Sequence, residues 1–114
     1  MIEYTVNVFE DRTEWRNKDG QLHREDGPAI ENVYGTKEWY INGKLHREDG
    51  PAIEWKNGAK AWHLNGKFHR EDGPAFEDGV YKTWYINGKE YTESEYEMEI
   101  SKRLNTCSEK VVEL

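Results

Sequence analysis

The sequence predicts a mostly β protein, an elongated antiparallel sheet of about four repeated β-hairpins with a C-terminal capping α-helix. The first observation behind this prediction is a heptapeptide, His-Arg-Glu-Asp-Gly-Pro-Ala, which recurs without a mismatch at 23–29, 46–52 and 69–75. The second is a set of Asn-Gly pairs that divide each 23-residue unit. The third is a change to helical periodicity after residue 90.

The fixed 23-residue period indicates a repeat protein. A sequence that returns at a short period returns to the same backbone geometry, because each unit can bury its apolar side only against the next unit. At 114 residues, the chain 1–114 is predicted to form a single repeat domain, with hairpins over about 4–90. Aromatic residues make up 13 % of the chain, so they are expected to supply much of the burial in a thin core.

Each repeat is predicted to be a hairpin that turns at an Asn-Gly pair. Asn-Gly tolerates positive φ at both central positions of a type I′ turn, which favours Asn57-Gly58 as the tip that joins two antiparallel strands. The other pairs, such as Asn42-Gly43, are expected to begin a longer return loop that carries the heptapeptide. Matching tryptophans place the hairpins at about 4–17, 29–42, 52–65 and 75–87. The first hairpin lacks Gly-Pro-Ala and is expected to be a degenerate cap.

Alternation within the strands sorts the side chains onto two faces of the sheet. One face is predicted to be the core ladder, which consists of Trp39, Ile41, Trp62, Leu64, Trp84 and Ile86 with Ile30, Ile53 and Phe76 beside them. The opposite face carries positions that vary between copies, namely Arg16, Tyr40, His63 and Tyr85.

A helix is predicted over about 92–105, followed by a tail over 106–114. Thr92 and Glu95 have the spacing of a capping box, which satisfies free amide groups at a helix N-terminus. Tyr96, Ile100 and Leu104 form an i, i+4 stripe that is expected to cover the open end of the last hairpin.

The charge, hydropathy and cysteine content of the chain indicate its compartment and exclude some classes of partner. The net charge of −7 argues against binding nucleic acid by its phosphates, because that requires a basic face. No apolar run is long enough to cross a bilayer, and the start of the chain lacks the basic and hydrophobic regions of a signal peptide. Cys107 is the only cysteine, which fits a reducing compartment. These observations predict a soluble, cytoplasmic protein with no membrane or nucleic-acid partner.

A Trp-x-x-Asn-Gly-Lys hairpin, then the heptapeptide, and finally a Thr-Glu-Ser-Glu helix start make up the distinctive pattern of this chain. Over about residues 13–105 it resembles the MORN-variant repeat proteins of bacteriophages and giant viruses. The resemblance implies a β-hairpin repeat fold and an interaction module. It also implies a viral protein whose partner is a host protein, such as a defence factor, in the host cytoplasm.

The heptapeptide is rich in residues that ligate metals or carry protons. A catalytic constellation occurs once in a chain, however, whereas this motif recurs identically, as structural positions do. Its Arg is expected to pair with an acid of the neighbouring copy. The sequence therefore predicts a structural repeat motif and no catalytic residue, metal ligand or cofactor. Its principal members are His23, Arg24, Asp26, His46, Arg47, Asp49, His69, Arg70 and Asp72.

The varied face is the predicted partner-binding surface. Tyr and Arg are enriched where protein interfaces concentrate their binding energy, so an exposed row of Arg16, Tyr40, His63 and Tyr85 can recognise a partner. A non-enzymatic protein-interaction module is thus the predicted function. The alternatives are a protein that sequesters a nucleotide-like molecule, with pockets between protomers, a small hydrolase, and an acidic DNA mimic based on residues 90–99. The exposed sheet edge at the N-terminal end leaves a homo-oligomer open.

Overall fold

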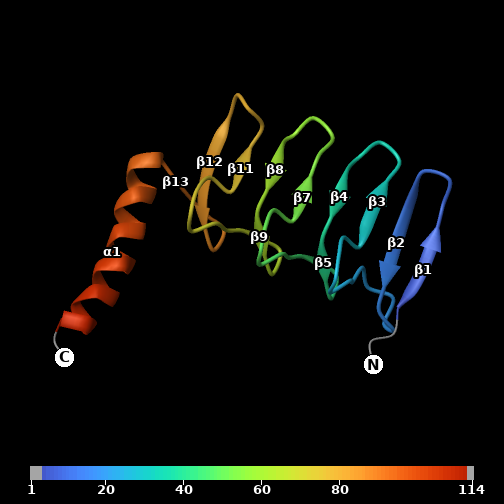
Figure 1. The fold of residues 1–114 in the computed structure, drawn as a ribbon, viewed down its shortest axis with the longest axis horizontal. Coiled ribbons are helices and arrows are strands. Elements are labelled where there is room, and N and C mark those ends of the chain that lie inside the picture. Colours follow the sequence, from blue (N-terminus) through green and yellow to red (C-terminus); the bar gives the residue numbers. More distant parts are fainter. Residues whose placement is uncertain (1–3, 113–114) are drawn as a thin grey trace.

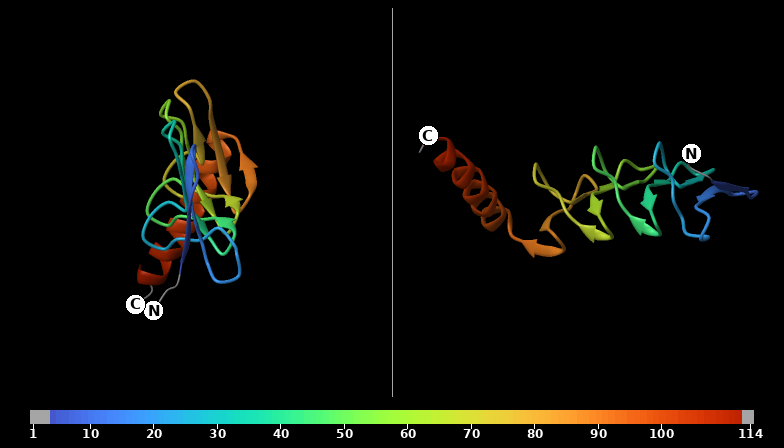
Figure 2. Two further views of the ribbon diagram at one scale, coloured as in Figure 1. Left: turned by 90° about the vertical axis from the view of Figure 1, so that its right-hand side faces the viewer. Right: turned by 90° about the horizontal axis from the view of Figure 1, so that it is seen from below.

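The computed structural model describes residues 4–112, and the side chains of residues 4–104. It confirms the predicted fold class, since it is mostly antiparallel β with a single C-terminal helix in the described part. The molecule is elongated, with principal extents of 55 × 38 × 18 Å. The hairpins follow one another along the long axis, and the helix lies at the end opposite the N-terminal hairpin (Figures 1 and 2).

Nine strands form one open sheet in which the neighbours are hydrogen-bonded and antiparallel. The predicted hairpins correspond to four strand pairs within it, and a ninth strand follows the last pair. In sheet order the strands are β1 (Thr5–Val8), β2 (Arg12–Arg16), β3 (Ile30–Asn32), β4 (Lys37–Glu38), β7 (Ile53–Glu54), β8 (Lys60–Ala61), β11 (Phe76–Glu77), β12 (Lys82–Ile86) and β13 (Lys89–Tyr91).

Small hairpins that the sequence did not predict lie below this sheet in Figure 1. One pairs β5 (Tyr40–Ile41) with β6 (Lys44–Leu45), and another pairs β9 (His63–Leu64) with β10 (Lys67–Phe68). The register leaves two residues between the strands in each case, and these are Asn-Gly pairs with positive φ at both positions, such as 48° and 81° at Asn42 and Gly43.

The predicted location of the type I′ turns was therefore wrong. At the tip of the third hairpin the strand register leaves five residues in the loop, and positive φ occurs there at Gly58 and not at Asn57. The Gly58 amide donates to the Trp55 carbonyl, which closes a wider turn. The tight turns are instead Asn42-Gly43, Asn65-Gly66 and Asn87-Gly88, because only there does a two-residue loop force both residues into the left-handed region.

The core also differs from the predicted ladder. Ala29, Ala52 and Ala75, the last residues of the heptapeptides, have no exposed surface, whereas the tryptophans and most of the ladder isoleucines are only half-buried. Each of these alanines sits between two neighbouring strands. For example, the Ala52 amide donates to Ala61 and its carbonyl accepts from Trp39. A single open sheet has little interior, so only small side chains at the centre are enclosed completely.

Helix α1 (Glu93–Val112) begins as predicted and extends seven residues beyond the predicted end, through most of the predicted tail. The capping box is present, because the Thr92 amide donates to Glu95 and the Glu95 amide donates to the Thr92 hydroxyl. Tyr96 is buried and Ile100 is half-buried, but Leu104 is 62 % exposed. The stripe therefore covers the last hairpin only over its first half, since the helix runs away from the sheet beyond that point (Figure 2).

Candidate functional site

The heptapeptide loops are organised around an arginine that stacks on a tryptophan. The guanidinium carbons of Arg24, Arg47 and Arg70 lie 3.9, 3.9 and 3.6 Å from the ring centroids of Trp15, Trp39 and Trp62 respectively. In each loop Nε donates to the Asp two residues later, at 2.9–3.1 Å, and Nη1 donates to the proline carbonyl. The arginine therefore fixes its own loop against the preceding hairpin. The expected pairing of this arginine with an acid is present, but mainly inside its own loop; Arg47 also pairs with Glu54 of the following hairpin at 2.9 Å.

Close packing against the stacked arginine favours glycine in these loops. A Cβ added at Gly50 would lie 2.9 Å from the Arg47 guanidinium carbon, and the other two loops show the same approach. The fixed Gly of the heptapeptide is thus explained by the space that the stacked arginine occupies.

The heptapeptide histidine connects its loop to the next repeat. His23 Nδ1 accepts a hydrogen bond from the Asn42 backbone amide at 2.9 Å, and His46 and His69 do the same with Asn65 and Asn87. Because Nδ1 accepts, the proton of the neutral imidazole is assigned to Nε2. The loop is joined to the same turn by a second bond, such as that from the Gly66 amide to the Leu45 carbonyl.

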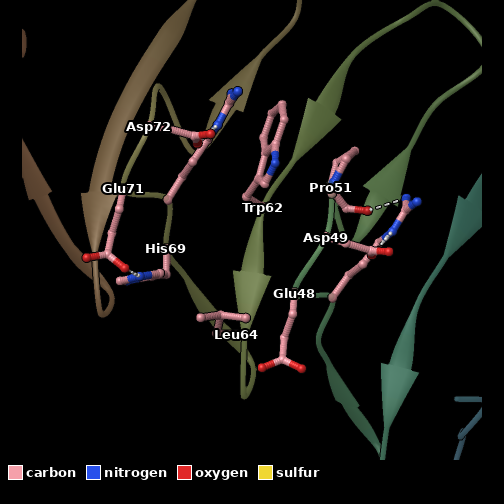
Figure 3. A pocket seen from close by; sticks show the side chains of 11 residues that line it. Glu48, Asp49, Pro51, Trp62, Leu64, His69, Glu71 and Asp72 are labelled. Carbon is pink, nitrogen blue, oxygen red and sulfur yellow. Dashed lines mark hydrogen bonds and ion pairs between the residues drawn. The ribbon is translucent and has the colours of Figure 1, made fainter.

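Grooves lie between successive heptapeptide loops. Figure 3 shows the one between 46–52 and 69–75, which has a volume of about 520 Å³, with Glu48 and Asp49 on one side and Glu71 and Asp72 on the other. A second groove of about 750 Å³ lies between the first and second loops. Both are acidic, because each loop supplies two carboxylates and one arginine. Among the described side chains, residues 4–104, no three of His, Cys, Asp or Glu converge as metal ligands do.

The predicted partner-binding row is less exposed than expected. His63 is only 6 % exposed, so its predicted exposure was wrong. Its ring lies 4.3 Å from that of Phe68, which in turn lies 4.8 Å from that of Tyr85. A residue of the small hairpin thus covers this position, which period-two alternation alone could not reveal.

The other members of that row also have intramolecular partners. The Tyr40 hydroxyl donates to Glu38 at 2.8 Å, and burial together with this carboxylate raises the pKa of Tyr40 to about 12. Arg16 donates to Glu14 and to the Gly20 carbonyl. Glu14 is itself buried, and the hydrogen bonds from Arg12 and Arg16 lower the pKa of its carboxyl group. Partner binding by Arg16, Tyr40, His63 and Tyr85 stays a prediction, and the stacking favours a role in joining repeats.

Exposed apolar side chains gather instead at the hairpin tips, a feature that the sequence reasoning missed. At three of the four tips a valine is followed by an aromatic residue, the first of these valines being the last residue of β1, and all of these side chains are exposed. We call this set the tip row: Val8 and Phe9, Val33 and Tyr34, and Val80 and Tyr81. The tips lie along one edge of the molecule (Figure 1). The signal was present in the sequence, because apolar pairs stand where turns normally carry polar residues.

Contacts between neighbouring tips hold part of this edge together. The Val33 amide donates to the Asp11 carbonyl at 2.9 Å, which links the first tip to the second. Lys56 of the third tip packs over Gly35 of the second, since a Cβ added at Gly35 would come within 3.2 Å of Lys56 Cβ. The first three tips are therefore linked to one another and are not independent loops; we call the line of tips the ridge.

The fold defines an open antiparallel β-hairpin repeat protein that ends in a helix. Comparison with family models, with curated proteins and with solved structures finds no match to this chain. The helix described here is too polar to cross a membrane.

Proposed function

We propose that this protein acts as a non-enzymatic interaction module that binds another protein through the tip row. The observation that carries this proposal is the exposure of Val33, Tyr34, Val80 and Tyr81, each of which is at least 67 % exposed. Large apolar side chains exposed in proximity favour association, because burial of their surface against a partner releases about 25 cal/mol per Å². Valine and tyrosine on short, hydrogen-bonded tips also lose little conformational freedom on binding.

The repeat architecture suits such a role. The constant heptapeptide holds the hairpins at regular spacing, while the tip sequences differ between copies, as at the third tip, where Lys56 and Asn57 stand at the positions of Val33 and Tyr34. Trp55 packs edge-on against Phe76 of the next repeat and is half-buried. A partner that docks along the ridge would thus meet two apolar tips, a basic tip and a further apolar tip in a fixed order.

The grooves do not favour the alternative of a nucleotide-like ligand. The arginines that would bind a phosphate already donate to Asp49, Asp72 and the proline carbonyls, and they cover the tryptophan faces on which a base would stack. The remaining carboxylates would repel a phosphate group.

The test is affinity capture from a lysate of the cells in which the protein occurs, with three forms of the full chain. The wild type is compared with Tyr34→Ser/Tyr81→Ser and with a matched control, Met98→Ser/Leu104→Ser, which removes two equally exposed apolar side chains from the helix. The partner should be captured by the wild type and by the control, with at least a tenfold loss for the tip variant. Equal capture by both variants, with unchanged circular dichroism, would remove the tip row from consideration.

A further inference from the structure

The two edge strands of the nine-stranded sheet, β1 and β13, differ in charge and in what covers them. At the C-terminal end, β13 begins with Lys89 and Glu90, and helix α1 packs against β12 and β13. At the N-terminal end, β1 has β2 as its one neighbour in the sheet. Charged residues and covering elements are the usual protection of an edge strand. The C-terminal edge has both, and β1 has neither among the described residues.

The register shows which backbone groups of β1 face outward. Trp15 of β2 directs its amide to the Ala29 carbonyl and its carbonyl to the His23 amide, both on the side away from β1. Val6 lies opposite Trp15, and Val8 lies opposite Thr13. Thr13 is two residues before Trp15, so its backbone groups point to the same side of β2 as those of Trp15. Because hydrogen bonding alternates along an antiparallel ladder, the amides and carbonyls of Val6 and Val8 point away from β2.

The side chains of this edge are suited to pairing. The strand reads Thr5-Val6-Asn7-Val8, with no charge and no proline, in a chain of which 34 % is charged. Val6 and Val8 lie on the same face and are 43 % and 78 % exposed. The edge is therefore extended, uncharged and partly apolar, which is the combination that pairs with another strand.

We infer that β1 pairs with β1 of a second copy of this chain, antiparallel about a two-fold axis at Asn7. In this register Val6 faces Val8 of the second copy and Val8 faces its Val6, so the outward groups form four N–H···O bonds. The two nine-stranded sheets then continue as one sheet of eighteen strands. No like charges face each other in this register. Beyond the valines, Thr5 would lie opposite Phe9 of the second copy, and Tyr4 would lie opposite Glu10. This inference does not rest on the proposed function.

In this register only Val6, Asn7 and Val8 of each β1 face one another, so the contact is small and the dimer is weak and depends on concentration. Each chain carries a net charge of −7, and the repulsion between copies is screened by salt. Association is therefore expected to strengthen as the ionic strength rises. The eighteen-stranded sheet of the dimer would carry two tip rows, one from each copy.

Sedimentation equilibrium over a range of concentrations in 0.5 M salt tests the pairing. The wild type, 13.5 kDa as a monomer, should approach twice that mass, and Val8→Lys should stay a monomer. Val33→Lys is the control, because it places the same charge on another exposed valine (67 % exposed, against 78 % for Val8) away from β1, and it should dimerise as the wild type does. A monomeric wild type at millimolar concentration, or a dimeric Val8→Lys, would overturn the inference.

Disulfide trapping tests the register. Opposed residues of a non-hydrogen-bonded pair have Cα atoms about 4.5 Å apart, within disulfide range. In a Cys107→Ser background, Asn7→Cys should form a covalent dimer on mild oxidation, since Asn7 faces its own copy across the axis. Thr5→Cys should not, because the two copies of residue 5 would be offset by four residues, about 13 Å along the strand. Trapping of Thr5→Cys with no trapping of Asn7→Cys would contradict the proposed pairing.

Discussion

The guanidinium carbon of Arg47 lies 3.9 Å from the centroid of the Trp39 ring, and the same stack occurs in the first and third heptapeptide loops. The arginine is held there by Asp49, by the Pro51 carbonyl and by Glu54. A charged residue thus serves as a packing element of a protein that has few fully buried large side chains. The glycine that follows the Asp leaves the space for it.

The first prediction concerns the coupling between Gly50 and Arg47. Gly50→Ala should lower the free energy of unfolding by about 1–3 kcal/mol, because the added methyl group displaces the guanidinium from Trp39. In an Arg47→Ala background the same substitution should cost less than about 0.5 kcal/mol, since nothing then occupies the space. Urea unfolding of the four proteins of this cycle measures the coupling. Additive costs would show that the stack does not impose the glycine.

A second prediction concerns Asn65 in the tight turn of the third repeat. Asn65 has a φ of 51°, so Asn65→Ala should cost about 1 kcal/mol, whereas Asn65→Gly should be nearly neutral. The His46 hydrogen bond to the amide of this residue is available in both variants. Thermal unfolding of the pair checks the turn assignment, and equal stability of the two variants would refute it.

A third prediction follows from the burial of His63. Desolvation lowers the pKa of this imidazole below its ordinary value of 6.5, and Nδ1 is buried without a hydrogen-bond partner in the described structure. The unfolded chain therefore binds a proton more readily than the folded one, so stability is lost as the pH falls below about 6.5 towards the lowered pKa.

His63→Phe removes this contribution and retains the stack on Phe68. Urea midpoints of the two proteins should diverge as the pH falls from 7 to 5, with the variant losing less stability. The remaining histidines are common to both proteins, so the difference reports His63. Parallel profiles would show that His63 does not contribute to acid sensitivity.

Much of the fold was predictable because its signals are local or periodic. Three identical heptapeptides require three identical loop environments, and the Thr92–Glu95 capping box is complete within four residues. The position of the tight turns was not predictable in this way. Asn57-Gly58 and Asn65-Gly66 are the same dipeptide, and they differ only in how many residues the strand register leaves in the loop.

The candidate site shows the limit of pattern reasoning more clearly. Alternation assigned His63 and Tyr40 to one exposed face, but a face is exposed only if nothing packs on it, and Phe68 packs on His63. The tip row could not be predicted as exposed, because apolar residues at a turn are unusual but the sequence does not show whether they fold back into a core.

By itself, the sequence determined the 23-residue repeat, the succession of hairpins, the C-terminal helix and its cap, because these depend on backbone preferences and on identity between copies. Only the tertiary structure decided which side chains are covered. It enclosed the alanines, stacked arginine on tryptophan, buried His63, and left the tips and the β1 edge in solvent. The physical reason is that burial depends on the neighbour that packs over a residue, and strand alternation does not reveal that neighbour: Phe68 covers His63 and Arg47 covers Trp39, each from the segment that follows the strand.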